Sequence, residues 1–179
     1  ETRDFYRMEA ECELKFRELG PCYHLCTSEN TPILFHNEGE FKTAMNIIAL
    51  ASGLFPDIAI LTFEVMSNHL HFALCGNVNR IHEWFKKMVI LLRRHPELKD
   101  SKEAVGSLQE KIIVVGNLDN LRNVIAYINR NGYVADSGHT PFSYPWGANK
   151  LFFNDEAKSR YELLKIMATA RWKRSAFHS

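Results

Sequence analysis

The sequence predicts a single α+β domain, a ferredoxin-like sandwich in which helices pack on a four-stranded, mostly antiparallel sheet. Segments rich in β-forming residues and segments with apolar residues at helical spacing follow one another in the order β-α-β-β-α-β-α, and a last helix comes after them. The length of 179 residues, with 46% hydrophobic and 24% charged residues, suits one globular domain. We expect this domain to span residues 1–179, with its core in about residues 20–150.

The first three strands and the first helix are expected in the N-terminal half of the chain. Residues 21–28 form a β-rich run after a charged lead-in, and residues 38–54 carry apolar residues at helical spacing before a Phe-Pro stop. Two further apolar, β-rich runs, residues 57–65 and 70–74, are separated by a tight connection. These patterns predict a strand, a helix and then two consecutive strands.

The C-terminal half supplies the second helix and the fourth strand. Residues 79–94 have one apolar side and predict an amphipathic helix, whereas the polar residues 97–110 predict a mobile segment. Four β-formers at residues 112–115 predict a short strand. A last helix is expected at about residues 154–173, because acidic residues stand at its start and the chain then becomes basic.

A helix that carries a tyrosine is expected after the fourth strand. It runs over residues 117–131, with Asn117 as its N-cap and Gly132 as its stop. Its apolar residues form one stripe, and Tyr127 and Asn131, four residues apart, lie together at the edge of that stripe. Such a tyrosine is either a half-buried core residue or a functional phenol, and the helix alone does not decide between them.

Two histidines open the strand at residues 70–74. His69 and His71 flank Leu70, so on a strand both imidazoles point to one face and Leu70 points to the other. Two imidazoles on one face are either a pair of ligands for a divalent metal ion or a polar pair on the surface. Asn68, just before them, is a candidate to orient a histidine or to cap the turn.

The four cysteines do not form the dense framework of a secreted disulfide protein. Cys22, His24 and Cys26 alternate and would share one face of a strand, which raises the idea of a zinc site. Three ligands on one flat strand diverge from a tetrahedral ion, however. A buried strand with small cysteine side chains is the better interpretation.

The net charge of +1 identifies no partner, and no apolar run approaches the roughly 20 residues that span a bilayer. The charged N-terminal segment lacks the apolar run of a signal peptide, so we expect a cytoplasmic protein with no membrane partner. Basic residues gather locally, either as solvated helix faces or as nucleic-acid contacts: Lys86, Lys87, Arg93 and Arg94 in the middle of the chain, and Arg171, Lys173 and Arg174 at its end.

Two motifs carry a family resemblance. The run Phe63-Glu-Val-Met-Ser-Asn-His-Leu-His-Phe-Ala-Leu74 is similar to an MPNHxH strand, and Tyr127-Ile-Asn-Arg-Asn131 is similar to a YIxxNP helix. Weaker matches are Tyr23-His24-Leu25 to YHV, residues 108–113 to WQ, and Tyr144-Pro-Trp146 to YPWSS. In this order, over about residues 22–150, they resemble the HUH single-tyrosine transposases, in particular the REP-associated tyrosine transposases and other insertion-sequence-200-like enzymes.

The resemblance implies a function and a set of site residues. It makes His69, His71 and Asn131 the ligands of Mg²⁺ or Mn²⁺, and Tyr127 the nucleophile that cuts single-stranded or hairpin DNA through a 5′-phosphotyrosine intermediate. We expect the protein to be a monomer or a homodimer. Beside these residues we expect supporting roles for His24, Asn68 and Asn120, and DNA contacts from Lys86, Lys87, Arg93, Arg94, Arg130 and Trp146.

Two other functions stay open at this point. One is a transposase-derived DNA-binding or regulatory protein without catalysis, and the other is an unrelated metal hydrolase or structural protein. The sequence departs from the family motifs at three positions: Ser67 and Gly132 replace prolines, and Gly147 replaces a serine. These departures bear on activity more than on the fold.

Overall fold

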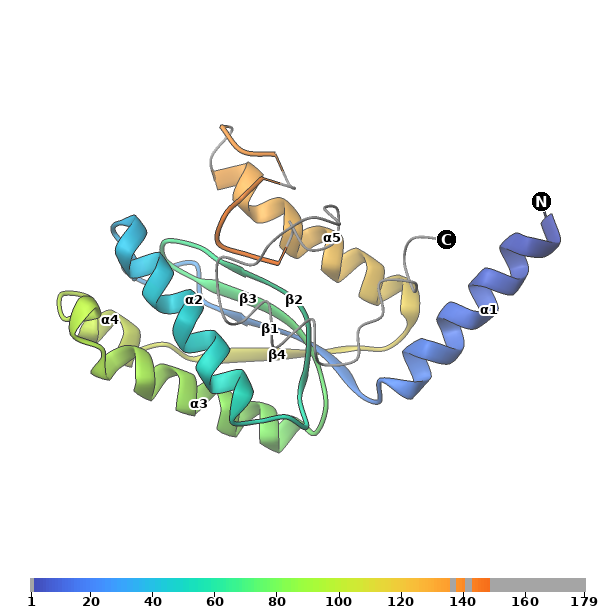
Figure 1. The fold of residues 1–179 in the computed structure, drawn as a ribbon, viewed down its shortest axis with the longest axis horizontal. Coiled ribbons are helices and arrows are strands. Elements are labelled where there is room, and N and C mark those ends of the chain that lie inside the picture. Colours follow the sequence, from blue (N-terminus) through green and yellow to red (C-terminus); the bar gives the residue numbers. More distant parts are fainter. Residues whose placement is uncertain (1, 136–137, 141–142, 149–179) are drawn as a thin grey trace.

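A computed structural model describes residues 2–135, 138–140 and 143–148. Figure 1 shows the arrangement of the helices and strands. In chain order they are α1 (Thr2–Glu18), β1 (Cys22–Thr27), α2 (Glu38–Gly53), β2 (Ala59–Val65), β3 (Leu70–Cys75), α3 (Val78–Arg94), the 3-10 helix η1 (Pro96–Leu98), α4 (Lys102–Gly106), β4 (Glu110–Val115) and α5 (Leu118–Ala135). The α+β prediction is confirmed, while the helix expected at about residues 154–173 lies outside the described residues.

The four strands form one antiparallel sheet in the order β2-β3-β1-β4. This order follows from a split β-α-β arrangement, because α2 carries the chain from β1 to the far edge and the β2–β3 hairpin returns it to the centre. The central strands β1 and β3 therefore lie side by side, with Cys26 opposite His71 and His24 opposite Ala73.

The two faces of the sheet have different coverings. Figure 1 shows α2, α3 and α4 on one face and α5 on the other. Leu70, Phe72 and Leu74 of β3 belong to the main apolar cluster, which also contains the buried residues of α2 and α3. Ala73 and Cys75 alternate with them and belong to a smaller cluster with α5. His71 shares the face of Ala73, and so β3 presents it toward α5.

The prediction of a mobile segment at residues 97–110 was wrong. Polar side chains dominate this stretch, but Leu98, Val105 and Leu108 are buried, and they join η1 and α4 to the main core. Three widely spaced apolar residues leave too weak a periodic pattern to reveal a short helix in the sequence. The charged lead-in before β1 is likewise a helix, α1, whose Glu9 pairs with Arg122 of α5 at 2.7 and 3.0 Å.

Gly132 does not end the tyrosine helix, as the sequence predicted, since α5 continues to Ala135. The residue has a packing role instead. A Cβ atom at this position would lie 2.3 Å from Cγ of Tyr144, so only glycine lets that ring rest on the helix. The Gly132 N–H also donates to the buried Glu64 carboxylate at 3.1 Å, a bond that a proline could not make.

A disulfide joins Cys22 and Cys75, although no disulfide was expected from the cysteine pattern. The two residues are direct partners in the register of β1 against β3. That register is a tertiary property, which explains why cysteine spacing did not reveal the pair. The bond also removes Cys22 from the metal ligands considered for β1.

Among the described residues, no helix combines the length and the apolar character needed to cross a membrane.

Candidate functional site

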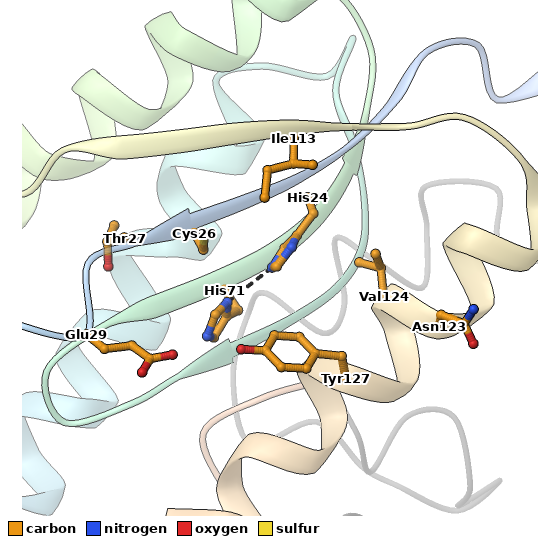
Figure 2. Close-up of a pocket in the computed structure, with 9 residues that line it drawn as sticks. All are labelled: His24, Cys26, Thr27, Glu29, His71, Ile113, Asn123, Val124 and Tyr127. Atoms are coloured by element: carbon orange, nitrogen blue, oxygen red, sulfur yellow. Dashed lines mark hydrogen bonds between the residues drawn. The ribbon is translucent and has the colours of Figure 1, made fainter.

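A pocket of about 460 Å³ lies over β1 and β3 on the side covered by α5. Figure 2 shows its lining side chains converging from both strands, the loop after β1, the neighbouring β4 and the helix. The residues are His24, Cys26, Thr27, Glu29, His71, Ile113, Asn123, Val124 and Tyr127.

Two imidazoles, those of His24 and His71, line this pocket, and a third, that of His69, packs against His71. The rings of His69 and His71 are 4.9 Å apart between centroids and nearly perpendicular, at 87°. His24 reaches His71 from the neighbouring strand, with His24 Nε2 3.1 Å from His71 Nδ1. The residues at positions 24 and 71 are diagonal neighbours across the β1–β3 pair, a separation that long or aromatic side chains can bridge.

Hydrogen bonds decide which nitrogen of His69 is available to a ligand. The Asn68 amide nitrogen donates to the Glu29 backbone carbonyl at 2.6 Å, so the Asn68 oxygen faces His69 Nδ1 at 2.8 Å. An amide oxygen only accepts, and therefore His69 Nδ1 carries the proton. Its Nε2 atom keeps a lone pair that a cation can use.

His71 has a buried nitrogen without a partner. The side chain is only 2% exposed, and its Nε2 atom finds no hydrogen-bond partner within the part of the chain that the structure describes. Leaving a buried polar atom unsatisfied costs about 1–3 kcal/mol. A cation bound at this nitrogen would remove that cost.

The three histidines are neutral at pH 7. Burial, and next the neighbouring His69 and His24, lower the pKa of His71 to about 3. Burial also lowers the pKa of His24, with a smaller effect from Lys111, and the pKa of His69. A neutral imidazole is the form that binds a metal ion.

Tyr127 of α5 stands over the histidines. Its ring centroid lies 5.5 Å from that of His71 and 5.8 Å from that of His24, and the residue is 40% exposed. Burial raises the pKa of Tyr127, and the charge of Glu29 raises it further, while Arg130 opposes this shift. The phenol therefore combines access from solvent with a position beside the imidazoles.

Buried polar contacts hold α5 at this distance from the sheet. Thr62 Oγ1 of β2 donates to Asn129 Oδ1 at 2.8 Å, and both residues are buried. Ile128 of α5 belongs to the apolar cluster that contains Leu61 and Ala73 of the sheet, and the bond from the Gly132 N–H to Glu64 fixes the next turn. These contacts lie immediately after Tyr127 in the helix, and so they set the height of its ring above the sheet.

Two groups of side chains have the spacing of metal ligands. Glu29, His69 and His71 form one group, in which the candidate ligand atoms all lie within 4.8 Å of one another. His24, Cys26 and His71 form the second group at the same spacing. Sequence reasoning missed Glu29, because it is an exposed loop residue whose proximity to His69 depends on the pairing of β1 with β3.

Asn131, the expected third ligand, is bonded within its own helix through its amide nitrogen, and its amide oxygen is the atom that could coordinate an ion. Its amide nitrogen donates to the backbone carbonyls of Tyr127 and Ile128, at 3.2 and 3.3 Å, and the residue stands outside the set that lines the pocket. Asn120 is exposed in the first turn of α5, where its backbone N–H donates to the cap residue Asn117 at 2.8 Å. The ligand role of Asn131 therefore stays a prediction.

The basic candidates occupy two sides of the sheet. Arg130 is exposed on α5 and close enough to Tyr127 to influence its pKa. Lys111 of β4, which the sequence analysis did not single out, acts in the same way on His24. The Trp146 ring stacks on the Phe41 ring, with 5.0 Å between their centroids, and packs against the main core. Lys86, Lys87, Arg93 and Arg94 are exposed on α3, across the sheet from α5, while Arg171, Lys173 and Arg174 lie outside the described residues.

No family model and no curated protein matches the chain. Among solved structures, the chain is similar to a REP-associated tyrosine transposase bound to a REP hairpin, with a TM-score of 0.52 and 13% sequence identity. The similarity covers 74% of this chain and 78% of the transposase chain. The two proteins share a fold. At this identity, the transposase is a distant structural neighbour of the present chain.

Proposed function

We propose that this protein is a metal-dependent endonuclease and strand transferase that cuts single-stranded DNA with Tyr127 as nucleophile. The observation that carries the proposal is the position of the Tyr127 ring, whose centroid lies 5.5 Å from that of His71, itself next to the imidazoles of His24 and His69. The solved neighbour, which is described as bound to a hairpin, makes hairpin DNA the proposed substrate.

The residues present fit a divalent cation. His69 Nε2 has a free lone pair, and the buried His71 Nε2 is without a partner among the described residues. Neutral imidazoles together with the Glu29 carboxylate form a donor set that suits Mn²⁺ or Mg²⁺. We propose that His69 and His71 hold this ion, which would polarise a phosphate oxygen and offset charge in the transition state.

Tyr127 supplies the covalent step. Its Oη atom attacks the phosphorus in line, so that an Oη–P bond forms as the bond from phosphorus to the 3′ oxygen breaks. The products are a 5′-phosphotyrosine and a 3′-hydroxyl end; the phenol gives up one proton to solvent and the departing 3′ oxygen takes one up, so the step involves no net loss of protons. The energy of the phosphodiester bond is retained in the adduct, and attack by another 3′-hydroxyl can therefore rejoin DNA without ATP.

DNA would approach from the exposed side of α5. Arg130 is proposed to contact a phosphate beside the reacting one, and Lys111 offers a second positive charge near the pocket. The basic residues of α3 serve a substrate that wraps to the opposite face of the sheet. Trp146 offers less to a base, because part of its ring already stacks on Phe41.

The covalent adduct is the decisive test. Full-length protein is incubated with Mn²⁺ and a pool of hairpin oligonucleotides with randomised single-stranded flanks, and adducts are separated on denaturing gels. We expect an adduct with the wild type and none with Tyr127→Phe or His69→Ala.

Two results would assign a different function. Tight hairpin binding without an adduct indicates a transposase-derived binding protein. DNA cleavage that survives Tyr127→Phe but disappears in His69→Ala indicates a metal hydrolase in which the tyrosine is not the nucleophile.

A further inference from the structure

Glu29 lies where the loop after β1 passes the two histidines of β3. Its carboxylate is one of three groups whose ligand atoms are within 4.8 Å of one another, the others being His69 and His71. Figure 2 shows the carboxylate directed toward the ring of His71 and the hydroxyl of Tyr127. The side chain is exposed at the mouth of the pocket, and a substrate phosphate could therefore reach the same place.

We propose that Glu29 is the carboxylate ligand of the cation held by His69 and His71, in the role that the family resemblance gives to Asn131. This inference rests on the proposed function, because it names a further ligand of the same metal site. A carboxylate with two imidazoles suits Mn²⁺ and Mg²⁺ better than two imidazoles alone, since these ions prefer oxygen donors.

The backbone at Glu29 is held by the same residue that orients His69. Asn68 donates from its amide nitrogen to the Glu29 carbonyl at 2.6 Å and accepts from His69 Nδ1 at 2.8 Å. The end of β1 is fixed as well, because Thr27 Oγ1 accepts from the Leu70 N–H at 2.9 Å. The Asn68 side chain thus connects the two proposed ligands Glu29 and His69 before any ion binds. Residues that hydrogen-bond to metal ligands commonly orient them in this way.

An independent observation points to a ligand at this place. His71 is 98% buried, and its Nε2 atom has no hydrogen-bond partner in the described part of the chain. Since Nδ1 of the same ring is engaged by His24, Nε2 is the nitrogen left to coordinate. In Figure 2 this second ring nitrogen faces the side of the pocket where Glu29 lies.

Asn131 is the first rival for this role. Its amide nitrogen is bonded to two carbonyls of its own helix, so its amide oxygen is the atom that could coordinate an ion. Cys26 is the other rival, in the group with His24 and His71. Sulfur is a soft donor, which suits Mn²⁺ or Mg²⁺ less well than the oxygen of a carboxylate does.

Manganese binding tests the proposal without relying on catalysis. Metal-stripped full-length protein is titrated with Mn²⁺, and free Mn²⁺ is measured by its EPR signal. We expect Glu29→Gln, which removes the charge and keeps the shape, to raise the Kd at least tenfold. Asn131→Ala, Cys26→Ser and the control Glu103→Gln, which changes the same charge on the distant α4, should stay within twofold of the wild type.

Glu29 is refuted as a ligand if Glu29→Gln binds Mn²⁺ within twofold of the wild type, or if Asn131→Ala or Cys26→Ser causes the loss instead. Circular dichroism of each variant confirms that the fold is retained. The proposed function fails separately: it requires that the wild type forms a Tyr127-dependent adduct and that His69→Ala abolishes Mn²⁺ binding. An adduct together with an unaffected Glu29→Gln rejects the Glu29 inference alone.

Discussion

The Nε2 atom of His24 lies 3.1 Å from the Nδ1 atom of His71, across the junction of strands β1 and β3. This contact engages one nitrogen of the His71 ring and leaves the other, Nε2, facing the pocket. Histidine ligands of metal ions are commonly oriented by a hydrogen bond at the second ring nitrogen. We therefore expect His24 to be a positioning residue for His71.

Replacing His24 should weaken metal binding without removing a ligand. His24→Phe fills the space but leaves His71 Nδ1 without its partner, and we expect the Kd for Mn²⁺ to rise about 10- to 100-fold. His24→Gln retains a side-chain oxygen that can accept from Nδ1 and should recover part of the loss. Manganese EPR titration measures both variants.

His95→Phe serves as the control for this substitution, because His95 is an exposed histidine at the end of α3. Its Mn²⁺ affinity should match that of the wild type. A His24→Phe protein with unchanged affinity, or a His24→Gln protein as weak as His24→Phe, would remove His24 from the positioning role.

Local sequence patterns were sufficient to predict features that depend on residues close together in the chain. His69 and His71 flank Leu70, and the structure brings the two imidazoles together while Leu70 joins the opposite core. The same applies to Asn117, which caps the helix of Tyr127 through the N–H of Asn120. In each case the partners are within a few residues, so periodicity and capping rules apply directly.

Local patterns did not predict contacts that depend on how segments far apart in the sequence pair with one another. The proximity of Glu29 to His69, and the bond between Cys22 and Cys75, both require the register of β1 against β3. The same applies to Gly132, because a glycine is required there by the contact with the Tyr144 ring and not by the end of a helix. Turn and stop residues are ambiguous when a tertiary contact also demands a small side chain.

Stability should fall in acid because of the histidine cluster. The pKa of His71 is lowered from 6.5 to about 3 in the folded protein, so below pH 6.5 the unfolded chain binds a proton that the folded chain excludes. As far as His71 is concerned, the free energy of unfolding is highest above pH 6.5. It decreases as the pH falls below 6.5 and stops changing below about pH 3. His24 and His69, whose pKa values are also lowered, add to the same trend.

Urea unfolding in EDTA, at intervals from pH 7.5 to 4, measures this dependence. His71→Leu removes the largest of the three contributions and should give a smaller fall in stability over that range than the wild type. Equal pH slopes for the two proteins would show that His71 is protonated as easily in the folded state as in the unfolded chain, contrary to its burial. Adding Mn²⁺ to the wild type should raise stability near neutral pH, since a cation binds only the folded site.

Thr62 should stabilise the fold and the position of Tyr127 together. Thr62→Val keeps the volume of the side chain but removes the donor to Asn129, and we expect unfolding to become easier by about 1–3 kcal/mol. The rate of adduct formation should fall as well, because α5 loses one of its buried attachments to β2. Ser107→Ala, which removes an exposed hydrogen bond just after the end of α4, should change neither measurement appreciably.

Gly132→Ala separates a packing role from a helix-ending role. In an unconstrained helix interior, alanine is about 1 kcal/mol more favourable than glycine, so a simple propensity argument predicts stabilisation. Here the added Cβ would lie 2.3 Å from Cγ of Tyr144, whose hydroxyl donates to the Val65 carbonyl at 2.9 Å and whose ring therefore has little freedom to move. We expect the overpacked variant to lose about 1–3 kcal/mol in urea unfolding. Gly116→Ala, where a Cβ meets nothing within 4 Å, should remain close to the wild type, and a stabilised Gly132→Ala protein would mean that the Tyr144 ring does not rest on α5.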